Sequence, residues 1–171
     1  MFLDWLFGNN NNQNTIDLTI NSVLPDKAKN DIEKGILPTF NTATIILSKN
    51  EICHFIDRAI HVTEEKQRNT QIFRASNSIR IMKGWTIHIG NGNLTPNYKN
   101  VAKYNKGLLY ITSNRIMFSS KEGAFDKKLT ELSAIMPYSD GVGLQFGDKV
   151  YNVMLVDPIY AVTIINVLTS K

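Results

Sequence analysis

The sequence predicts a mainly β (α+β) fold: a partly closed antiparallel β-barrel capped by a C-terminal α-helix, with an N-terminal helical extension. Two hairpin patterns, at 107–119 and 142–155, place apolar residues at every second position on both arms. A third observation is the terminal stretch, which opens with Asp157-Pro158, an N-cap residue followed by proline at the first helical position. Short strands followed by one apolar helix are typical of a curved sheet covered by that helix.

Composition limits the classes of function. The chain has 171 residues and a formal net charge of +4, which is unevenly distributed, since residues 1–40 hold three basic and five acidic side chains. A mildly basic main domain is compatible with an anionic surface but lacks the dense positive charge of nucleic-acid binders, so no nucleic acid is expected. The single cysteine, Cys53, excludes an intramolecular disulfide and fits a reducing, cytoplasmic compartment. No apolar run approaches the roughly 20 residues of a spanning helix.

The chain is predicted to divide into an apolar peptide with an Asn-rich tether (1–14), a helical extension (15–40) and the main domain (41–171). The first seven residues, MFLDWLF, are bulky and apolar, and the tether GNNNNQN is too polar to fold alone. Phe2, Trp5 and Phe7 are therefore candidate binding residues. They dock into a partner groove, enter a membrane interface, or pack back onto the domain, and the sequence leaves these alternatives open.

Two elements are expected before the main domain. Residues 16–24 fit a short helix or a strand equally well. A helix begins at Pro25-Asp26 and places Ala28, Ile32 and Ile36 on one face. Gly35 and Pro38 end it. This helix is expected to cover the main domain or a second subunit.

The period then changes to that of strands. Strands are predicted at 44–47, 52–62, 79–83 and 85–89, with a bulge or bend near Gly84, and residues 64–78 form a loop or an extended hairpin arm. In the central hairpin, Leu109 and Ile111 alternate with their neighbours on the first arm, as Ile116 and Phe118 do on the second. A strand at 125–129 follows, and 130–135 is a helical turn or more strand. The final helix carries an apolar stripe of Ile159, Val162, Ile165 and Leu168, widened by Ala161 and Ile164.

The central hairpin, KGLLYITSNRIMF at 106–118, resembles the G-x-L-Y-x-T-N-x-R-x-x-F hairpin of the GRAM and bacterial pleckstrin-homology-like (PH-like) domains. Tyr138-Ser-Asp-Gly141 is similar to a later turn of these families, and the terminal helix takes the place of their barrel-capping helix. The resemblance covers 42–168 and departs from the family in the long 64–104 region and in a helix without tryptophan. It implies a non-catalytic module that binds phosphoinositides, peptides or proteins, often as an oligomer.

Catalytic and metal chemistry is not expected. The three histidines and Cys53 do not match a zinc signature, so no metal or cofactor is predicted. Cys53 and His54 are neighbours on a strand, so their side chains point to opposite faces and cannot act as nucleophile and base.

Arg115 is the charged residue of most interest in the hairpin, and it can pair with a carboxylate, stack on Tyr110 or contact an anionic ligand. Lysines flank the hairpin at Lys99, Lys103, Lys106, Lys121, Lys127 and Lys128. They form a basic rim for anionic lipid, or they are solvated lysines that protect sheet edges from aggregation, the interpretation we favour. The sequence thus predicts a PH-like module that acts through protein–protein contact and self-associates. The alternative is a peripheral binder of anionic membranes at the inner face of the membrane.

Overall fold

The computed structural model describes the backbone of residues 18–69, 78–82, 85–88 and 97–170, and the side chains of 18–66 and 101–170. The chain forms two compact units. The first comprises residues 1–63 and 102–171, and the second comprises residues 64–101. The predicted roles of Phe2, Trp5 and Phe7 lie outside the described residues. Within the described part of the chain, no helix is long and apolar enough to cross a membrane.

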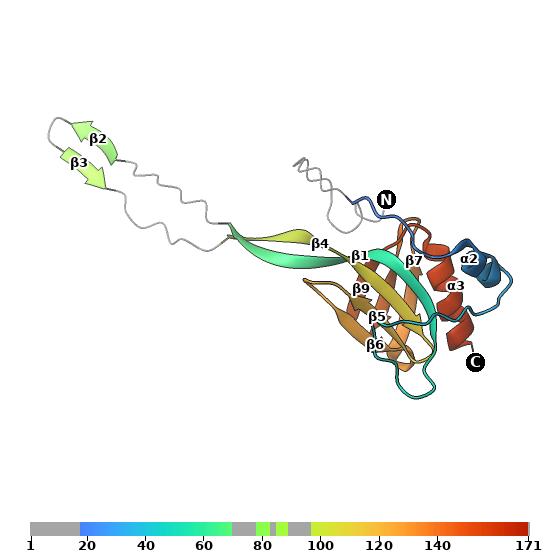
Figure 1. Ribbon diagram of the computed structural model, residues 1–171. Helices are drawn as coiled ribbons and strands as arrows, with labels where there is room; N and C mark the ends of the chain where they lie inside the picture. Colours follow the sequence, from blue (N-terminus) through green and yellow to red (C-terminus); the bar gives the residue numbers. More distant parts are fainter. Residues whose placement is uncertain (1–17, 70–77, 83–84, 89–96, 171) are drawn as a thin grey trace. The chain divides into compact units, whose positions relative to one another are not determined.

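A mainly antiparallel sheet of seven strands is the centre of the first unit (Figure 1). Its order is β6-β5-β4-β1-β9-β8-β7, with β1 Cys53–Asn69, β4 Asn97–Thr112, β5 Arg115–Ser119, β6 Phe125–Lys128, β7 Leu132–Pro137, β8 Gly141–Phe146 and β9 Lys149–Met154. The predicted mainly β class is confirmed. The sheet does not close into a barrel, because the edge strands β6 and β7 are not paired with each other. A 3-10 turn at Leu129–Glu131 links them, so 130–135 contains both a helical turn and a strand.

The central hairpin has the register that its alternation predicts. Leu109 pairs with Phe118 and Ile111 with Ile116, and all four side chains belong to the main core. Tyr110 pairs with Met117 on the opposite face of the sheet, where both join a second apolar cluster. Burial on both faces fixes this register, because a slip of one residue would exchange the two sets.

The sheet curves strongly around the core. In a flat sheet, β6 and β9 would lie about 19 Å apart, since four strand spacings separate them. The Phe125 ring of β6 and the Tyr151 ring of β9 are instead 4.6 Å apart between centroids. His61 of β1 packs edge-on against Phe118 and Phe125 in the same aromatic group, and its burial lowers the pKa of the imidazole.

The C-terminal helix α3, Pro158–Thr169, covers the open side of the core (Figure 1). Its predicted start at Asp157-Pro158 is confirmed, although Asp157 makes no side-chain capping hydrogen bond. The predicted apolar stripe is only partly correct. Ala161, Ile164 and Ile165 are buried, whereas Ile159 is 64% exposed. The side of α3 that faces the core therefore includes Ile164 and Ile165 but not Ile159, the first residue of the predicted stripe.

The predicted helical extension over 15–40 is not supported. Among residues 18–40, only α2, Asp26–Glu33, is helical, and it is part of the main core through Ala28 and Ile32. Ile36, expected on the same helical face, lies beyond the helix and is 55% exposed. The helix begins where Pro25-Asp26 predicts and packs beside α3, where the hydroxyl of Tyr160 donates a hydrogen bond to Glu33 at 3.0 Å.

Polar side chains of β1 hold the N-terminal segment against the sheet. The buried carboxylate of Asp57 accepts hydrogen bonds from the hydroxyl of Ser22 at 2.8 Å and from the amide of Val23 at 2.7 Å. Nδ1 of His54 is 2.7 Å from the carbonyl oxygen of Pro38. These two contacts hold both ends of the α2 region on the same strand, so the segment before the main domain is an integral part of its fold.

Residues 43–47 do not form the predicted strand. They run as irregular chain over the second apolar cluster, where Ile45 and Leu47 pack beside Cys53 and Tyr110. The hydroxyls of Thr44 and Tyr110 are 2.9 Å apart, which gives the buried phenol a hydrogen-bond partner. The apolar residues of this stretch cover one face of the sheet, and the stretch does not pair as a strand within it.

The second unit contains a two-stranded sheet of β2, Ser78–Met82, and β3, Trp85–His88. Both strands confirm the predicted pair, with Ile79 opposite Ile87 and a shift of register between Arg80 and Met82. Strand β1 extends to Asn69, so residues 64–69 form an extended arm rather than a loop. The later hairpin of β8 and β9 is also confirmed.

Candidate binding site

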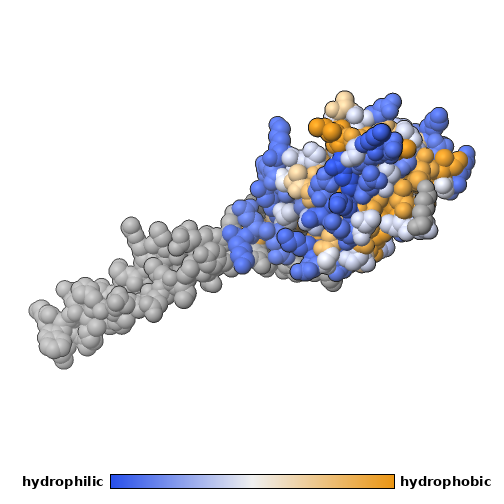
Figure 2. Space-filling model, turned by 90° about the horizontal axis from the view of Figure 1, so that it is seen from below, coloured by the Kyte–Doolittle hydropathy of each residue, from blue (hydrophilic) through white to orange (hydrophobic). Residues whose placement is uncertain are grey.

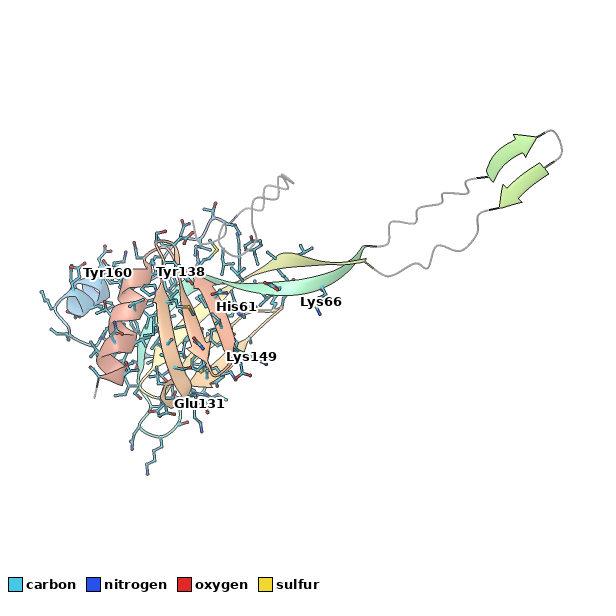
Figure 3. All side chains as sticks on the ribbon, turned by 180° about the vertical axis from the view of Figure 1, so that it is seen from behind. His61, Lys66, Glu131, Tyr138, Lys149 and Tyr160 are labelled. Carbon is cyan, nitrogen blue, oxygen red and sulfur yellow. The ribbon has the colours of Figure 1, made fainter. Side chains whose placement is uncertain are left out.

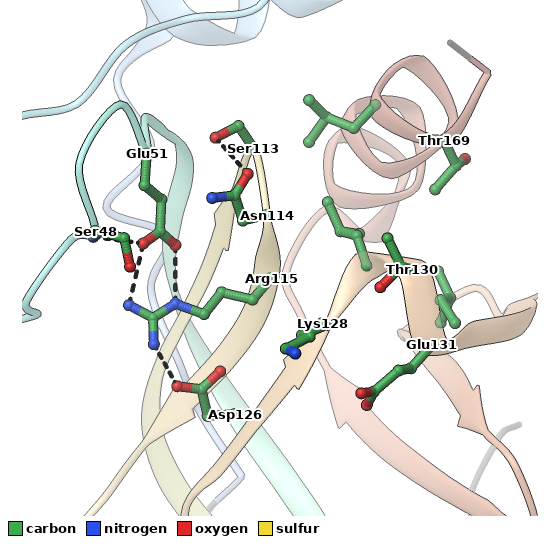
Figure 4. A pocket seen from close by; sticks show the side chains of 13 residues that line it. Ser48, Glu51, Ser113, Asn114, Arg115, Asp126, Lys128, Thr130, Glu131 and Thr169 are labelled. Atoms are coloured by element: carbon green, nitrogen blue, oxygen red, sulfur yellow. Dashed lines mark hydrogen bonds and ion pairs between the residues drawn. The ribbon is translucent and has the colours of Figure 1, made fainter.

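A hollow of about 880 Å³ in the first unit lies where the β4–β5 turn, the β6–β7 connection and the end of α3 meet (Figure 4). Its polar lining comes from Ser48, Glu51, Ser113, Asn114, Arg115, Asp126, Lys128, Thr130, Glu131 and Thr169, and its apolar lining from Leu129, Leu132 and Leu168. We call this site the charged hollow.

Arg115 is bound on several sides within the charged hollow. Its Nε donates to Glu51 at 2.8 Å and a terminal nitrogen donates to Asp126 at 2.6 Å. The other terminal nitrogen donates to the carbonyl of Ile46 at 2.7 Å and to Glu51 at 3.2 Å. The expected pairing of Arg115 with a carboxylate is confirmed. Figure 4 shows the guanidinium between the two acidic side chains.

Glu51 is the buried partner of this pair, with a side chain that is 0% exposed. Burial alone would raise the pKa of Glu51, but hydrogen bonds from Arg115, from the Thr112 hydroxyl and from the Ser48 amide, together with the charge of Arg115, lower it to about 2. The carboxylate is thus ionised and fully paired at neutral pH, and it joins the 46–51 loop to the β4–β5 turn.

The remaining charges of the hollow have both signs. Lys128 and Glu131 are exposed on its wall, near the apolar floor of Leu129 and Leu132. This mixture does not favour an anionic ligand, because the acidic lining residues outnumber the basic ones. The hollow is therefore mainly a structural junction.

The flanking lysines fall into two described groups, one around a smaller hollow that Glu122 also lines and one on β6. Lys106 and Lys121 line one smaller hollow with Ser119 and Ser120, and Lys106 donates to the carbonyl of Thr19 at 3.2 Å. Lys103 pairs with Glu122 at 3.3 Å. The backbone of Lys99 belongs to β4, and its side chain lies outside those described.

Lys127 and Lys128 lie on the edge strand β6, and Nζ of Lys127 is 5.9 Å from the centre of the Tyr151 ring. The opposite edge, β7, has a shift of register between Leu132 and Ala134 and ends at Pro137. Short length, lysine, irregular register and proline all hinder the addition of a further strand. A partner is therefore expected to bind side-chain surface rather than a sheet edge.

Cys53 and the histidines provide no reactive group in the described structure. Burial raises the pKa of the Cys53 thiol to about 11, so the thiol is protonated at neutral pH. His54 and His61 are buried on β1, and the side chain of His88 lies outside those described. In the described part of the chain, no group of three or more His, Cys, Asp or Glu side chains is arranged to hold a metal ion.

A second site, which the sequence did not predict, lies at the start of α3. A groove of about 320 Å³ is lined by Pro137, Tyr138, Ser139, Val156, Asp157, Pro158, Ile159 and Val162. We call it the apolar groove. Its flanking side chains Val156 and Ile159 are 43% and 64% exposed. Figure 3 shows Tyr138 at one end of β7 and Glu131, of the charged hollow, at the other.

Single exposed apolar side chains are normal on a protein surface, but several of them together around a depression can mark a binding site. Figure 2 shows that hydrophobic residues interrupt the hydrophilic surface in several patches on the face seen from below. The apolar groove differs from single exposed residues because two large aliphatic side chains lie beside an aromatic ring and two prolines. No sequence signal marked it, since nearly every position of α3 is apolar and several stripes fit equally well.

Comparison with known proteins gives one structural likeness. No protein-family model and no curated protein sequence matches the chain. The N-terminal PH domain of Vps36 aligns with 78% of this chain and 91% of its own, with 14% sequence identity and a TM-score of 0.42.

Proposed function

We propose that the chain is a non-catalytic PH-like binding module that acts through protein–protein contact and self-associates through the apolar groove. The observation that carries the proposal is the exposure of Ile159 and Val156 beside a groove built from regular elements of the fold. Apolar area that is exposed in one chain becomes favourable when a second chain covers it, at roughly 25 cal/mol per Å² before the costs of association.

The rest of the molecule supports this choice. The charged hollow uses its arginine and buried glutamate in the fold, and both sheet edges hinder strand addition. The two exposed apolar side chains of the groove, Val156 and Ile159, do not belong to the main core, whereas Val162 packs partly against it.

Light scattering of the intact chain over a series of concentrations tests self-association. The expected result is an average mass that rises above 19.3 kDa with concentration. Ile159→Lys should keep the mass at that of the monomer. Val150→Lys is the matched control, because Val150 is 45% exposed but lies outside the groove, and it should behave like the wild type. Equal losses in both variants, or an Ile159→Lys variant that associates like the wild type, would contradict the proposal.

A second candidate function rests on the second unit. Residues 64–101 carry six basic and two acidic side chains, so this unit accounts for a net charge equal to the +4 of the whole chain. Such a concentration of charge favours an anionic membrane surface. Sedimentation with anionic vesicles should then be strong at low salt and weaken as salt is added. Absence of sedimentation at low salt would remove this candidate.

A further inference from the structure

The apolar groove has its apolar side chains on the outward side of α3. The helix buries Ala161, Ile164 and Ile165 toward the core, while Ile159 and Val162 line the groove. Tyr138 closes one side from the β7–β8 turn, and Val156 closes another from the segment between β9 and α3. Val156 and Ile159 can therefore contact an apolar ligand without any change in the core, against which Val162 already packs in part.

The described chain begins in an apolar cluster that extends to this groove. Leu18 packs on the buried pair Ile60 and Val62, and Tyr138, which lines the groove, packs on the same pair. Leu18 itself lines a different hollow, with Lys106 and Lys121. A segment joined to Leu18 through a short tether therefore starts from the same apolar cluster as the groove.

Seventeen residues precede Leu18 in the sequence. Six of the first seven, in MFLDWLF, are apolar, and ten residues separate Phe7 from Leu18. Ten residues of random coil have a root-mean-square span of roughly 16–19 Å. A short flexible tether gives its ligand an effective concentration in the millimolar range. Side chains such as Phe and Trp bury roughly 150–250 Å² each, so two of them would cover a groove of this kind.

The lining of the groove favours an apolar occupant. Asp157 is the charged residue among the described residues that line it, and its carboxylate is paired with Lys29 at 3.7 Å. Because this charge is paired, the apolar side chains of the lining offer most of the contact surface to the apolar side chains of MFLDWLF. At micromolar protein concentration, the millimolar effective concentration of the tethered segment also exceeds that of a second copy.

We propose that the segment Met1–Phe7 of the same chain occupies the apolar groove and covers Val156 and Ile159. This inference rests on the proposed function, because it names the first ligand of the same groove. The segment competes with a second copy for the groove, so it sets the concentration at which self-association begins. Association therefore requires release of the segment.

Quenching of Trp5 fluorescence by acrylamide tests the proposal. The intact chain carries Trp85→Phe, so that Trp5 is the sole tryptophan, and is measured at about 1 µM, where intramolecular occupation dominates. Trp5 is expected to be protected in this protein. Adding Ile159→Lys should raise the quenching constant several-fold, and adding Val150→Lys should leave it unchanged.

The other outcomes each overturn the proposal. Full accessibility of Trp5 in every variant means that the segment does not dock, and equal protection in the Ile159→Lys variant means that it docks elsewhere. Protection that appears only as protein concentration rises identifies a second copy as the occupant, and protection that appears only with anionic vesicles identifies a membrane.

The same samples separate this inference from the proposed function. Trp5→Glu should release the segment and lower the concentration at which the mass rises in light scattering. If Trp5 is protected by the groove but this variant stays monomeric, self-association fails and docking stands. If Ile159→Lys abolishes association while Trp5 is always accessible, self-association stands and docking fails.

Discussion

The charged hollow at the C-terminal end of α3 and the apolar groove at its N-terminal end present opposite chemistry. The hollow is larger, yet its arginine and its buried glutamate are held in hydrogen bonds that join distant parts of the chain. The groove is smaller and has few polar contacts, but it exposes large aliphatic side chains. The comparison teaches that the larger, more highly charged site is a structural junction, whereas the exposed apolar area of the groove is the site that we propose for a partner.

The largest expected effect comes from breaking the junction. Arg115→Ala leaves the Glu51 carboxylate buried without its cation, which should lower the free energy of unfolding by about 3–5 kcal/mol. Lys128→Ala, in the same hollow but on its exposed wall, should change it by less than about 0.5 kcal/mol. Urea unfolding of both variants measures the difference. Similar small effects in both would mean that the ion pair does not hold the fold.

The second effect concerns the two faces of α3. Ile165→Ala removes a fully buried side chain and should cost about 2–5 kcal/mol of stability. Ile159→Ala should cost less than about 0.5 kcal/mol, because that side chain is 64% exposed. Thermal and urea unfolding of the pair distinguish the observed orientation of the helix from the predicted stripe, for which both substitutions would be equally costly.

The central hairpin was predictable from the sequence, but the partner of Arg115 and the buried face of α3 were not. The alternation of Leu109, Ile111, Ile116 and Phe118 was sufficient to predict the hairpin, because period-2 patterns and a tight turn are local properties. The partner of Arg115 was not predictable, since Glu51 lies 64 residues away and meets it because β1 lies beside β4 in the sheet. The face of α3 was undetermined for a different reason: a helix that is apolar on nearly all sides gives no preferred stripe.

The start of α2 was also predictable from the sequence, whereas its place in the main core was not. Pro25-Asp26 correctly predicted where α2 begins, but the sequence suggested a separate extension. The structure places Ala28 and Ile32 in the main core and uses Asp57 and His54 to hold the flanking chain. Such side-chain-to-backbone contacts depend on tertiary position, so no local pattern reveals them.

A third, smaller effect tests how firmly the segment beside the groove is held. Asp57→Ala removes the acceptor of the Val23 amide and the Ser22 hydroxyl, which should cost about 1–3 kcal/mol. Hydrogen exchange should show faster exchange of the Val23 amide in this variant, with the central hairpin unaffected. Unchanged exchange at Val23 would show that the contact is not needed to hold the segment.

The dependence of stability on pH tests the contribution of ionised Glu51 in the charged hollow. The pKa of Glu51 is lowered from 4.5 to about 2 in the fold, so the unfolded chain binds more protons between these values. The stabilisation from ionised Glu51 is therefore complete above pH 4.5 and is lost as the pH falls toward 2. Glu51→Gln should reduce the slope of unfolding free energy against pH in this window. An unchanged slope would assign the acid sensitivity to other carboxylates.

Self-association through the apolar groove is tested most directly by comparing one variant from each region in the same light-scattering series. Ile159→Lys alters the groove and Lys128→Glu alters the exposed wall of the hollow, and both leave the core untouched. The account predicts that Ile159→Lys stays monomeric at every concentration while Lys128→Glu associates like the wild type. Loss of association in Lys128→Glu together with normal association in Ile159→Lys would contradict it and place the binding site in the charged hollow.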